Sequence, residues 1–481
     1  MSRRLMKLYH HLPAAARPMA ATLRGLYLRW WRYGPTSGRL IREAQERERW
    51  TPAQWQAYRD ERLAYVLHRA ASEVPYYREH WQARRRLGDR ASWELLANWP
   101  VLEKDVLREQ AERFVADGHN PRRMFFQQTS GTTGTPIRQW RSRAALRALY
   151  ALAAARTRGW VGVSESDRWA RLGGQMVVPV ERRRPPFWVW NAAQHQLYLS
   201  TYHLAPDLLQ GYLDALRDYA VVCLTGYPSS IQMLAEAALR AGRQDLKIRA
   251  VITSAEPLLP HQRGIIEAGF RCRVQETYGM GENVAAASGC ESQQLHQWPE
   301  VGVLEVLDGT EPVPAGEVGD LVCTGLLELG MPLIRYRVGD RGSLPTEQTP
   351  CPCGRSLPGL GQLHGRSNEM LLTADGRRVF WLNPVLYGAP VREAQIIQET
   401  LDRIRLSYVP ADGFNSEWSR RLAERVRERM GDVEVTLDPV EQVPRSVNGK
   451  LQMVRCELSD EERASVLERK PVSAGSQVRA S

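Results

Sequence analysis

The sequence predicts an α/β protein: a large N-terminal domain with a mainly parallel sheet flanked by helices, followed by a small α+β domain. From about residue 120 to 365, short β-branched runs alternate with helix-like stretches. This alternation is typical of parallel strands covered by helices. After Gly365, three strand-like runs surround helices in a compact stretch that reaches about residue 460. They lie at 369–373, 403–409 and 433–437.

These patterns divide the chain into four predicted parts. They are a helical segment packed on the main domain (1–95), the α/β domain (96–365), the small domain (366–460) and a disordered tail (461–481). Within the first part, Thr51 is a predicted N-cap with Pro52 at the first helical position. The helical pattern that begins at Pro52 is expected to stop at Pro75.

Two strand–turn–helix units define the predicted sheet. A strand at 221–225 leads through a turn into a helix that Ser229 caps and that ends at Arg240. A strand at 248–253 leads into the turn Ser254-Ala-Glu-Pro257 and another helix. In open parallel sheets, ligands bind at the loops that follow the carboxyl ends of the strands. We therefore expect the ligand site at these turns.

Charge and hydropathy limit the function classes. The net charge is +11, and 60 of the 65 basic residues are arginines. No zinc-finger, RRM-like or helix-turn-helix signature accompanies this charge, so we expect no nucleic-acid partner. No run of 18 apolar residues and no signal-peptide core occur, which predicts a cytoplasmic protein. The oligomeric state stays open.

The segment Leu23–Arg32 mixes Trp, Leu and Arg and has two interpretations. It could lie on an anionic membrane surface, giving peripheral membrane contact through the N-terminus. The favoured interpretation is a helix that packs its aromatic side chains on the main domain.

A loop rich in glycine and hydroxyl groups is the strongest candidate for binding phosphate. It comprises Thr129, Ser130, Gly131, Thr132, Thr133, Gly134, Thr135 and Pro136. The glycines permit positive φ and close backbone approach, so consecutive N–H groups can hold an anion. A predicted strand at 124–128 leads into the loop and another at 136–140 leaves it. No Gly-Lys-Ser/Thr follows, so the loop is not a Walker A motif.

This loop resembles the phosphate-binding signature of the adenylate-forming superfamily, which includes acyl-CoA synthetases and peptide-synthetase adenylation domains. The chain is most similar to the phenylacetate–CoA ligase and capsular-polysaccharide-type branch, over about residues 76–455. The resemblance implies an adenylate-forming N-terminal domain and a small, mobile C-terminal lid. It also implies ATP, Mg²⁺ and CoA as cofactors or substrates.

The resemblance assigns roles to residues of two further motifs. Ser254, Ala255, Glu256 and Pro257 match the turn that contacts adenine. Glu276, Thr277, Tyr278 and Gly279 begin the next motif, which ends at Glu282. By this match Tyr278 stacks on adenine and Glu282 binds Mg²⁺, a hard cation suited to carboxylate ligands. Gly281 departs from the family, which has Thr or Ser there.

Three more residues complete the implied site. Asp340 matches the residue that binds both ribose hydroxyls, and Arg366 matches a nucleotide contact beside the hinge. The hinge position itself is Asn368, where the family has Asp or Lys. Lys450, one of only five lysines, matches the catalytic lysine that stabilises charge at the α-phosphate.

Three of the seven cysteines and one histidine form a candidate metal-binding set by residue type. Cys290, His296, Cys351 and Cys353 lie in two segments and provide three thiols and one imidazole, which suits a closed tetrahedral zinc site. The odd number of cysteines excludes a secreted disulfide framework. Some members of the branch carry a similar set, which implies structural Zn²⁺. The alternative is unrelated buried thiols beside a surface histidine.

The predicted activity is ATP-dependent, AMP-forming activation of a small organic acid through an acyl-adenylate, followed by thioester formation with CoA. The alternative is an adenylating enzyme of polysaccharide or cofactor biosynthesis that transfers acyl or AMP to a non-CoA acceptor. The third possibility is a non-enzymatic nucleotide-binding protein, against which the presence of both Lys450 and Glu282 argues. The resemblance implies an acid pocket near residues 140–150, the 170s and 227–230, and the Trp and Tyr content of these segments favours an aromatic or apolar acid.

Overall fold

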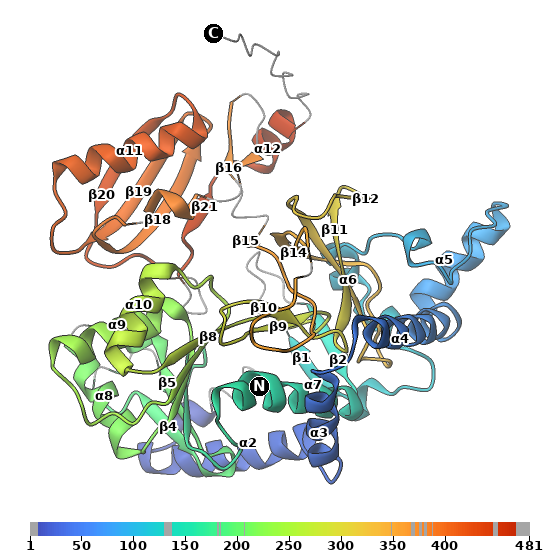
Figure 1. The fold of residues 1–481 in the computed structure, drawn as a ribbon, viewed down its shortest axis with the longest axis horizontal. Helices are drawn as coiled ribbons and strands as arrows, with labels where there is room; N and C mark the ends of the chain where they lie inside the picture. The colour runs from blue at the N-terminus through green and yellow to red at the C-terminus, as the bar shows by residue number, and fades with distance from the viewer. Residues whose placement is uncertain are drawn as a thin grey trace. The chain divides into compact units, whose positions relative to one another are not determined.

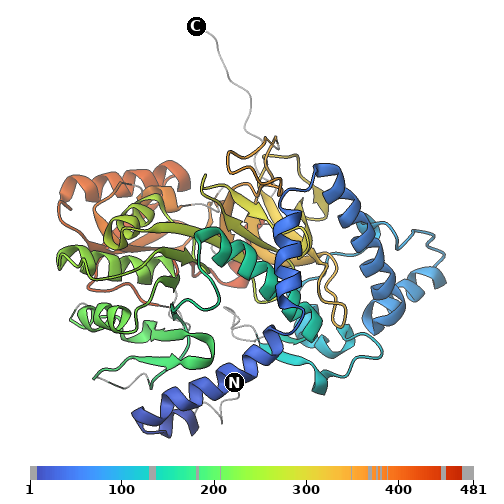
Figure 2. The same cartoon turned by 60° about the horizontal axis from the view of Figure 1, so that its bottom comes forward.

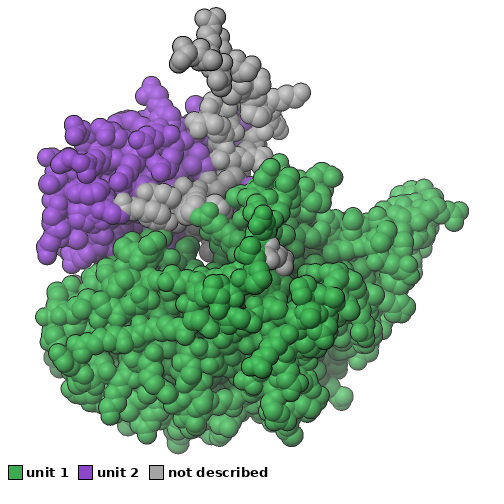
Figure 3. Space-filling view, viewed as in Figure 1, with its two compact units in different colours: residues 1–338, 342–363 green, residues 339–341, 364–481 purple. Residues whose placement is uncertain are grey.

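The computed structural model forms two compact units, residues 1–338 with 342–363 and residues 339–341 with 364–481 (Figure 3). The structure describes residues 8–128, 137–179, 182, 184–205, 207–347, 349–366, 371–374, 378–379, 382–386, 388–445 and 451–467. The glycine-rich loop 129–136, Asn368 and Lys450 therefore lie outside the described residues.

Four long helices open the first unit. They are α2 (Arg17–Arg32), α3 (Ser37–Arg47), α4 (Pro52–Glu73) and α5 (Pro75–Arg86). Thr51 caps α4 as predicted, because its hydroxyl accepts from the backbone of Gln54 and the Gln54 side chain accepts from the backbone N–H of Thr51. The helical pattern stops before Pro75, as predicted, but a new helix begins there. Pro75 occupies the first position of α5, where a missing N–H costs no hydrogen bond.

An eight-stranded sheet in the order β10-β9-β8-β7-β6-β3-β5-β4 is the centre of the first unit (Figure 1). The strands are β3 (Trp169–Gly173), β4 (Trp188–Asn191), β5 (Gln196–Ser200), β6 (Cys223–Gly226), β7 (Ala250–Thr253), β8 (Arg273–Gly279), β9 (Ala286–Gly289) and β10 (Leu295–Gln297). Five neighbouring strands of this sheet run parallel to one another, namely β8, β7, β6, β3 and β5. The predicted α/β class is confirmed, with β6 and β7 each starting two residues later than expected.

Helices cover this sheet and its neighbouring hairpin. They are α6 (Lys104–Glu109), α7 (Arg143–Leu152), α8 (Leu209–Asp218), α9 (Pro228–Arg240) and α10 (Pro260–Phe270). Strands β1 (Phe125–Gln128) and β2 (Arg138–Arg141) form the predicted antiparallel pair on either side of the glycine-rich loop. Helices α8, α9 and α10 pack together on the sheet through buried leucine, isoleucine and alanine side chains.

A second sheet, in the order β12-β11-β13-β14-β15, follows along the chain. Its strands are β11 (Gly302–Asp308), β12 (Glu311–Pro312), β13 (Gly319–Gly325), β14 (Tyr336–Gly342) and β15 (Leu363–Arg366). Strand β11 pairs antiparallel with both β12 and β13. Residues 339–341 of β14 and 364–366 of β15 belong to the second unit, so the boundaries between the two units fall within these strands.

The second unit is a small α+β structure, as predicted. Its elements are β16 (Leu371–Leu372), β17 (Arg378–Val379), β18 (Val391–Thr400), β19 (Arg403–Pro410), α11 (Ser416–Met430), β20 (Glu434–Pro439), β21 (Val454–Cys456) and α12 (Asp460–Leu467). Four of the strands form a mixed sheet in the order β20-β19-β18-β21. Helix α11 contributes Leu422 and Val426 to the buried core of this unit. Among the described helices of the whole chain, none is long and apolar enough to span a bilayer.

Candidate nucleotide site and metal centre

Two parallel strands, β6 and β7, end at the same level of the central sheet, and β8 continues three residues beyond that level. Gly226 at the end of β6 is opposite Thr253 on β7, and Thr253 is opposite Glu276 on β8. The turns that follow β6 and β7, and the last residues of β8, therefore lie along one edge. This edge carries Tyr227, the predicted adenine turn and the predicted Tyr278–Glu282 motif, at the position where parallel sheets bind ligands.

The turn after β7 is held in a strained backbone conformation. Ala255 has φ of 69°, a left-handed conformation that is unfavourable for any residue with a Cβ. The backbone N–H of Ser254 donates to Gly226 at 3.0 Å. The Glu256 carboxylate accepts from the backbone N–H of Ser229, at the start of α9, at 3.2 Å. These bonds join the turn to the neighbouring strand and helix.

Glu276 and Thr277 fix this turn from β8. The Thr277 hydroxyl donates to the backbone oxygen of Thr253 at 2.8 Å. Burial raises the pKa of Glu276, whereas a hydrogen bond from the backbone of Leu258 and the charge of Arg263 oppose the rise. Both side chains thus contact the protein at the edge of the sheet, which makes them positioning residues for the turn.

Glu282 is buried behind the end of β8. Its carboxylate accepts from the hydroxyl of Tyr336 at 2.9 Å. The guanidinium of Arg141 donates to the backbone oxygen of Gly281 at 3.0 Å and to that of Glu282. The predicted Mg²⁺ ligand is therefore held by groups on two other strands, which is how a metal-binding carboxylate is oriented.

Sequence reasoning missed Arg141 and Tyr336. Arg141 ends β2, directly after the glycine-rich loop, and burial lowers its pKa while the charges of Glu328 and Glu282 oppose this. Tyr336 lies four residues before Asp340, but the resemblance assigned a role to Asp340 alone. A hydroxyl or guanidinium that acts across strands has no signal in local spacing.

The segments predicted to bind the acid also meet in part. The Tyr227 hydroxyl accepts from the backbone N–H of Gly174 at 3.2 Å, and the Tyr202 hydroxyl donates to the oxygen of Gly174 at 3.1 Å. Trp140 is buried on β2.

The remaining residues predicted to bind the nucleotide lie at or near strand ends. Asp340 lies on β14 and Arg366 ends β15. Tyr278 and Gly279 end β8.

The four predicted metal ligands converge. The ligand atoms of Cys290, His296, Cys351 and Cys353 all lie within 4.8 Å of one another. The Sγ atoms of Cys290 and Cys351 are 3.6 Å apart, and Cys353 Sγ is 3.4 Å from His296 Nε2. Four ligands around zinc at bonds near 2.3 Å are separated by about 3.8 Å, so these spacings fit the ion.

Hydrogen bonds orient this cluster. His296 Nδ1 pairs with the backbone oxygen of Leu357 at 2.9 Å, which directs Nε2 toward the sulfurs. The cluster segments are joined by backbone bonds from Leu360 to Leu295 at 2.8 Å and from Gln297 to Pro358 at 2.8 Å. His296 is buried, so the alternative of a surface histidine is wrong.

The loop that carries the last two cysteines also holds the N-terminal helices. The backbone N–H of Ser356 donates to the oxygen of Glu48 at 3.0 Å, directly after α3. The Arg355 guanidinium lies 3.3 Å from the Glu48 carboxylate and 4.3 Å from the centre of the Trp160 ring. The Trp160 indole N–H donates to Glu48 at 2.8 Å. Metal ligation and the attachment of α3 therefore share one loop.

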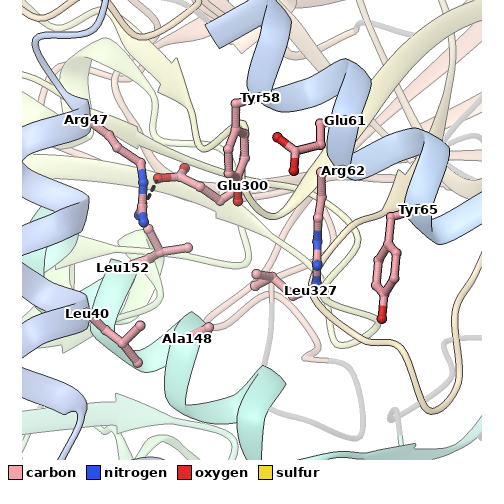
Figure 4. A pocket seen from close by; sticks show the side chains of 10 residues that line it. All are labelled: Leu40, Arg47, Tyr58, Glu61, Arg62, Tyr65, Ala148, Leu152, Glu300 and Leu327. Carbon is pink, nitrogen blue, oxygen red and sulfur yellow. Dashed lines mark ion pairs between the residues drawn. The ribbon is translucent and has the colours of Figure 1, made fainter. Parts of the chain in front are cut away.

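A cavity of about 560 Å³ opens between α3, α4 and α7 (Figure 4). Arg47 points into it and lies 3.5 Å from the Glu300 carboxylate, which also binds the buried Arg156. None of the described residues predicted to bind the nucleotide lines it. The cavity is therefore distinct from the residues predicted to bind the nucleotide, and its Arg47 and Glu300 are paired with each other.

Comparison with known proteins agrees with this arrangement. Residues 52–327 match the family described as AMP-binding enzyme, so the chain belongs to that family. Residues 371–457 match the CapK C-terminal domain. Together they confirm the predicted phenylacetate–CoA ligase and capsular-polysaccharide-type branch of the adenylate-forming superfamily.

Two curated relatives and one solved structure illustrate the similarity. A phenylacetate-coenzyme A ligase from Thermus thermophilus is 30% identical over 50% of this chain and 61% of its own length. Protein CapK from Staphylococcus aureus is 25% identical over 60% of this chain and 65% of its own length. The chain thus spans less than two thirds of these relatives.

The solved structure is a 2-hydroxyisobutyryl-CoA ligase in the postadenylation state, in complex with R3-HIB-AMP. It has a TM-score of 0.67 and 21% identity, and the match covers 87% of this chain and 93% of that one. At this identity the likeness supports the fold.

Proposed function

We propose that this protein activates a carboxylic acid with ATP and transfers the acyl group to the thiol of CoA. A carboxylate oxygen attacks the α-phosphorus, the bond to the bridging oxygen breaks, and pyrophosphate leaves. The thiol sulfur then attacks the acyl carbon, AMP leaves, and the thiol proton passes to solvent. The observation that supports this proposal is the edge where β6 and β7 end and β8 continues, along which the Ser254–Pro257 turn and the Tyr278–Glu282 motif both lie, in a chain of the AMP-binding enzyme family.

The residue roles follow from the motif matches. The Ser254–Pro257 turn and Tyr278 would hold adenine, and Asp340 would bind the ribose. The glycine-rich loop 129–136 would bind the phosphates. Lys450 would stabilise charge at the α-phosphate, and Arg366 would contact the nucleotide. These groups align reactants and neutralise charge, which is most of what such a transfer requires.

Two metal ions belong to the proposal. Glu282 would hold Mg²⁺, which neutralises phosphate charge when it is bound. The Cys₃His set would hold Zn²⁺ in a structural role, because four protein ligands leave no open position for catalysis. ATP and CoA are cytoplasmic metabolites, so we expect the enzyme to act in the cytoplasm.

The names of the relatives favour an aromatic or small organic acid, and aromatic residues near Tyr227 fit such a group. The match to the CapK C-terminal domain favours a second candidate, transfer of acyl or AMP to a non-CoA acceptor. Release of AMP that depends on CoA supports the first function. Release that proceeds with another acceptor and ignores CoA supports the second.

The test is ATP–pyrophosphate exchange over a panel of aromatic and aliphatic acids. Exchange with at least one acid is expected, and Lys450→Ala should reduce it about 10²-fold or more. The matched control is Lys247→Ala, which removes an exposed lysine before the N-terminal end of β7, whereas the Ser254–Pro257 turn follows the C-terminal end of that strand, and should leave exchange unchanged. No exchange with any acid, or full exchange in Lys450→Ala, would refute the adenylation mechanism.

A further inference from the structure

Helix α2 is firmly packed along one of its faces. Leu28 and Trp31 are buried, and the Trp31 ring lies 5.6 Å from that of Phe125 on β1. Gly25 approaches β4 so closely that a Cβ there would lie 2.2 Å from the Asn191 side chain. The helix runs along the β4 edge of the first unit (Figure 2). Its orientation is therefore set by its contacts.

The opposite face of α2 is also apolar, and it is exposed. Met19, Leu23, Leu26, Tyr27 and Trp30 are between 44% and 65% exposed. At 100° per residue these five side chains fall within an arc of about 100°, centred roughly opposite Leu28. A surface helix ordinarily has polar residues there. An outward stripe of five large apolar side chains points to a surface that binds something.

The charge around this stripe selects its partner. Residues 8–42 contain six arginines and no acidic residue. The Arg24 guanidinium lies 4.7 Å from the centre of the Tyr27 ring, and that of Arg143 lies 3.4 Å from the centre of the Trp30 ring. Two copies of the chain meeting through this face would bring like charges together. An anionic bilayer is complementary to both the charge and the apolar stripe.

We propose that the outer face of α2 docks on an anionic lipid bilayer, with the helix lying in the interface. Leucine, methionine and tryptophan would enter the boundary between headgroups and acyl chains, while the exposed Arg24 and Arg29 on either side of the stripe would bind lipid phosphates. The two interpretations of the N-terminal sequence thus apply to opposite faces of one helix. This inference does not depend on the adenylation activity.

Co-sedimentation with vesicles tests the proposal. The full chain should bind vesicles of phosphatidylcholine mixed with phosphatidylglycerol, and added salt should weaken the binding. Leu23→Glu with Leu26→Glu should reduce the partition coefficient about tenfold or more, because two charges enter the apolar stripe. Arg24→Gln should reduce it about fivefold through the loss of one basic charge.

The matched control is Leu87→Glu with Leu95→Glu, which changes two leucines that are also exposed and alters the charge equally. This variant should bind like the wild type, and thermal unfolding should show that both double variants are folded. Absence of binding to anionic vesicles, or equal binding by the two double variants, would overturn the proposal. So would a dimer that Leu23→Glu with Leu26→Glu dissociates while vesicles remain unbound.

Discussion

The metal cluster and the nucleotide edge are built in opposite ways. Around the cluster, Cys290, His296 and Cys351 are buried, and backbone hydrogen bonds on both sides of His296 close the site. The nucleotide edge consists of turns at strand ends, and one of them holds Ala255 in a left-handed conformation. The metal cluster is therefore a closed site, whereas the nucleotide edge is arranged so that its backbone groups can contact a ligand.

This difference teaches where stability and activity should separate. A closed tetrahedral site contributes to folding and takes no part in the reaction. A strained turn at a ligand site costs stability and persists because its geometry is needed. Changes at the cluster should therefore lower stability, whereas changes at the edge should lower catalysis or relieve strain and burial that cost stability.

The largest effect is expected from loss of the metal. Purified protein should contain about one zinc per chain, and His296→Ala should remove it and lower Tm by ~5–10 °C. The reason is that the loop holding Glu48 and α3 loses its anchor. Metal analysis and calorimetry measure both quantities. Cys272→Ser, which changes a partly buried thiol outside the cluster, should keep the zinc. A metal-free wild type of unchanged Tm would contradict the assignment.

Glu282→Gln should act on catalysis. Loss of the carboxylate charge that would hold Mg²⁺ should lower the rate of ATP–pyrophosphate exchange about 10²-fold. Tm should change little, because glutamine can still accept from the Tyr336 hydroxyl. Glu317→Gln alters an exposed loop residue and serves as the control. Unchanged exchange in Glu282→Gln would remove this residue from the metal site.

Ala255→Gly should show the strain at the edge directly. Glycine tolerates positive φ, so the variant should be about 1 kcal/mol more stable toward urea than the wild type. The control is Ala250→Gly, inside buried β7, which should be destabilised by about 1 kcal/mol. If both variants lose stability alike, the turn is not strained as the backbone angle indicates.

The smallest effect concerns Glu276 and pH. Burial raises its pKa, so the stabilisation from the protonated form is complete below the unfolded pKa and is lost as pH rises through the folded pKa. Glu276→Gln should therefore be more stable than the wild type at neutral pH, and the difference should shrink toward about pH 4. Urea midpoints across pH measure this. A difference that grows on acidification would contradict the sign.

Local signals predicted most of the fold. Alternating β-branched runs located β6 and β7, and Thr51 with Pro52 marked the start of α4, because each depends on neighbouring residues alone. The predicted stop at Pro75 is confirmed for α4, but the start of α5 at the same proline was not predicted. Proline stops one helix and begins another equally well, and only the packing of Tyr77 and Trp81 in the core favours α5.

The sites divide along the same line. The cluster of three thiols and one imidazole could be predicted because these groups have few other uses together, although the separation of 61 positions between Cys290 and Cys351 does not indicate that they meet. Arg141 and Tyr336 could not be predicted, because their contacts to Gly281 and Glu282 join strands far apart in the chain. Membrane contact and packing on the main domain were alternatives for residues 23–32, because a hydropathy pattern shows which residues are apolar but not which of them are buried.

One rung of the central sheet connects the two regions. Thr277 on β8 is paired with Ser288 on β9, and Ser288 is paired with the metal ligand His296 on β10. Strands β8, β9 and β10 are thus paired in register at this position. A shift of one strand by one residue would turn all its side chains to the other face of the sheet, so its neighbours resist such a shift. The candidate metal ligand His296 thus lies two strands from Thr277, which holds the candidate adenine turn. Loss of a metal from this cluster is expected to weaken the backbone pairing of β10 with β9, one strand away from β8, and so to lower the stability of the sheet.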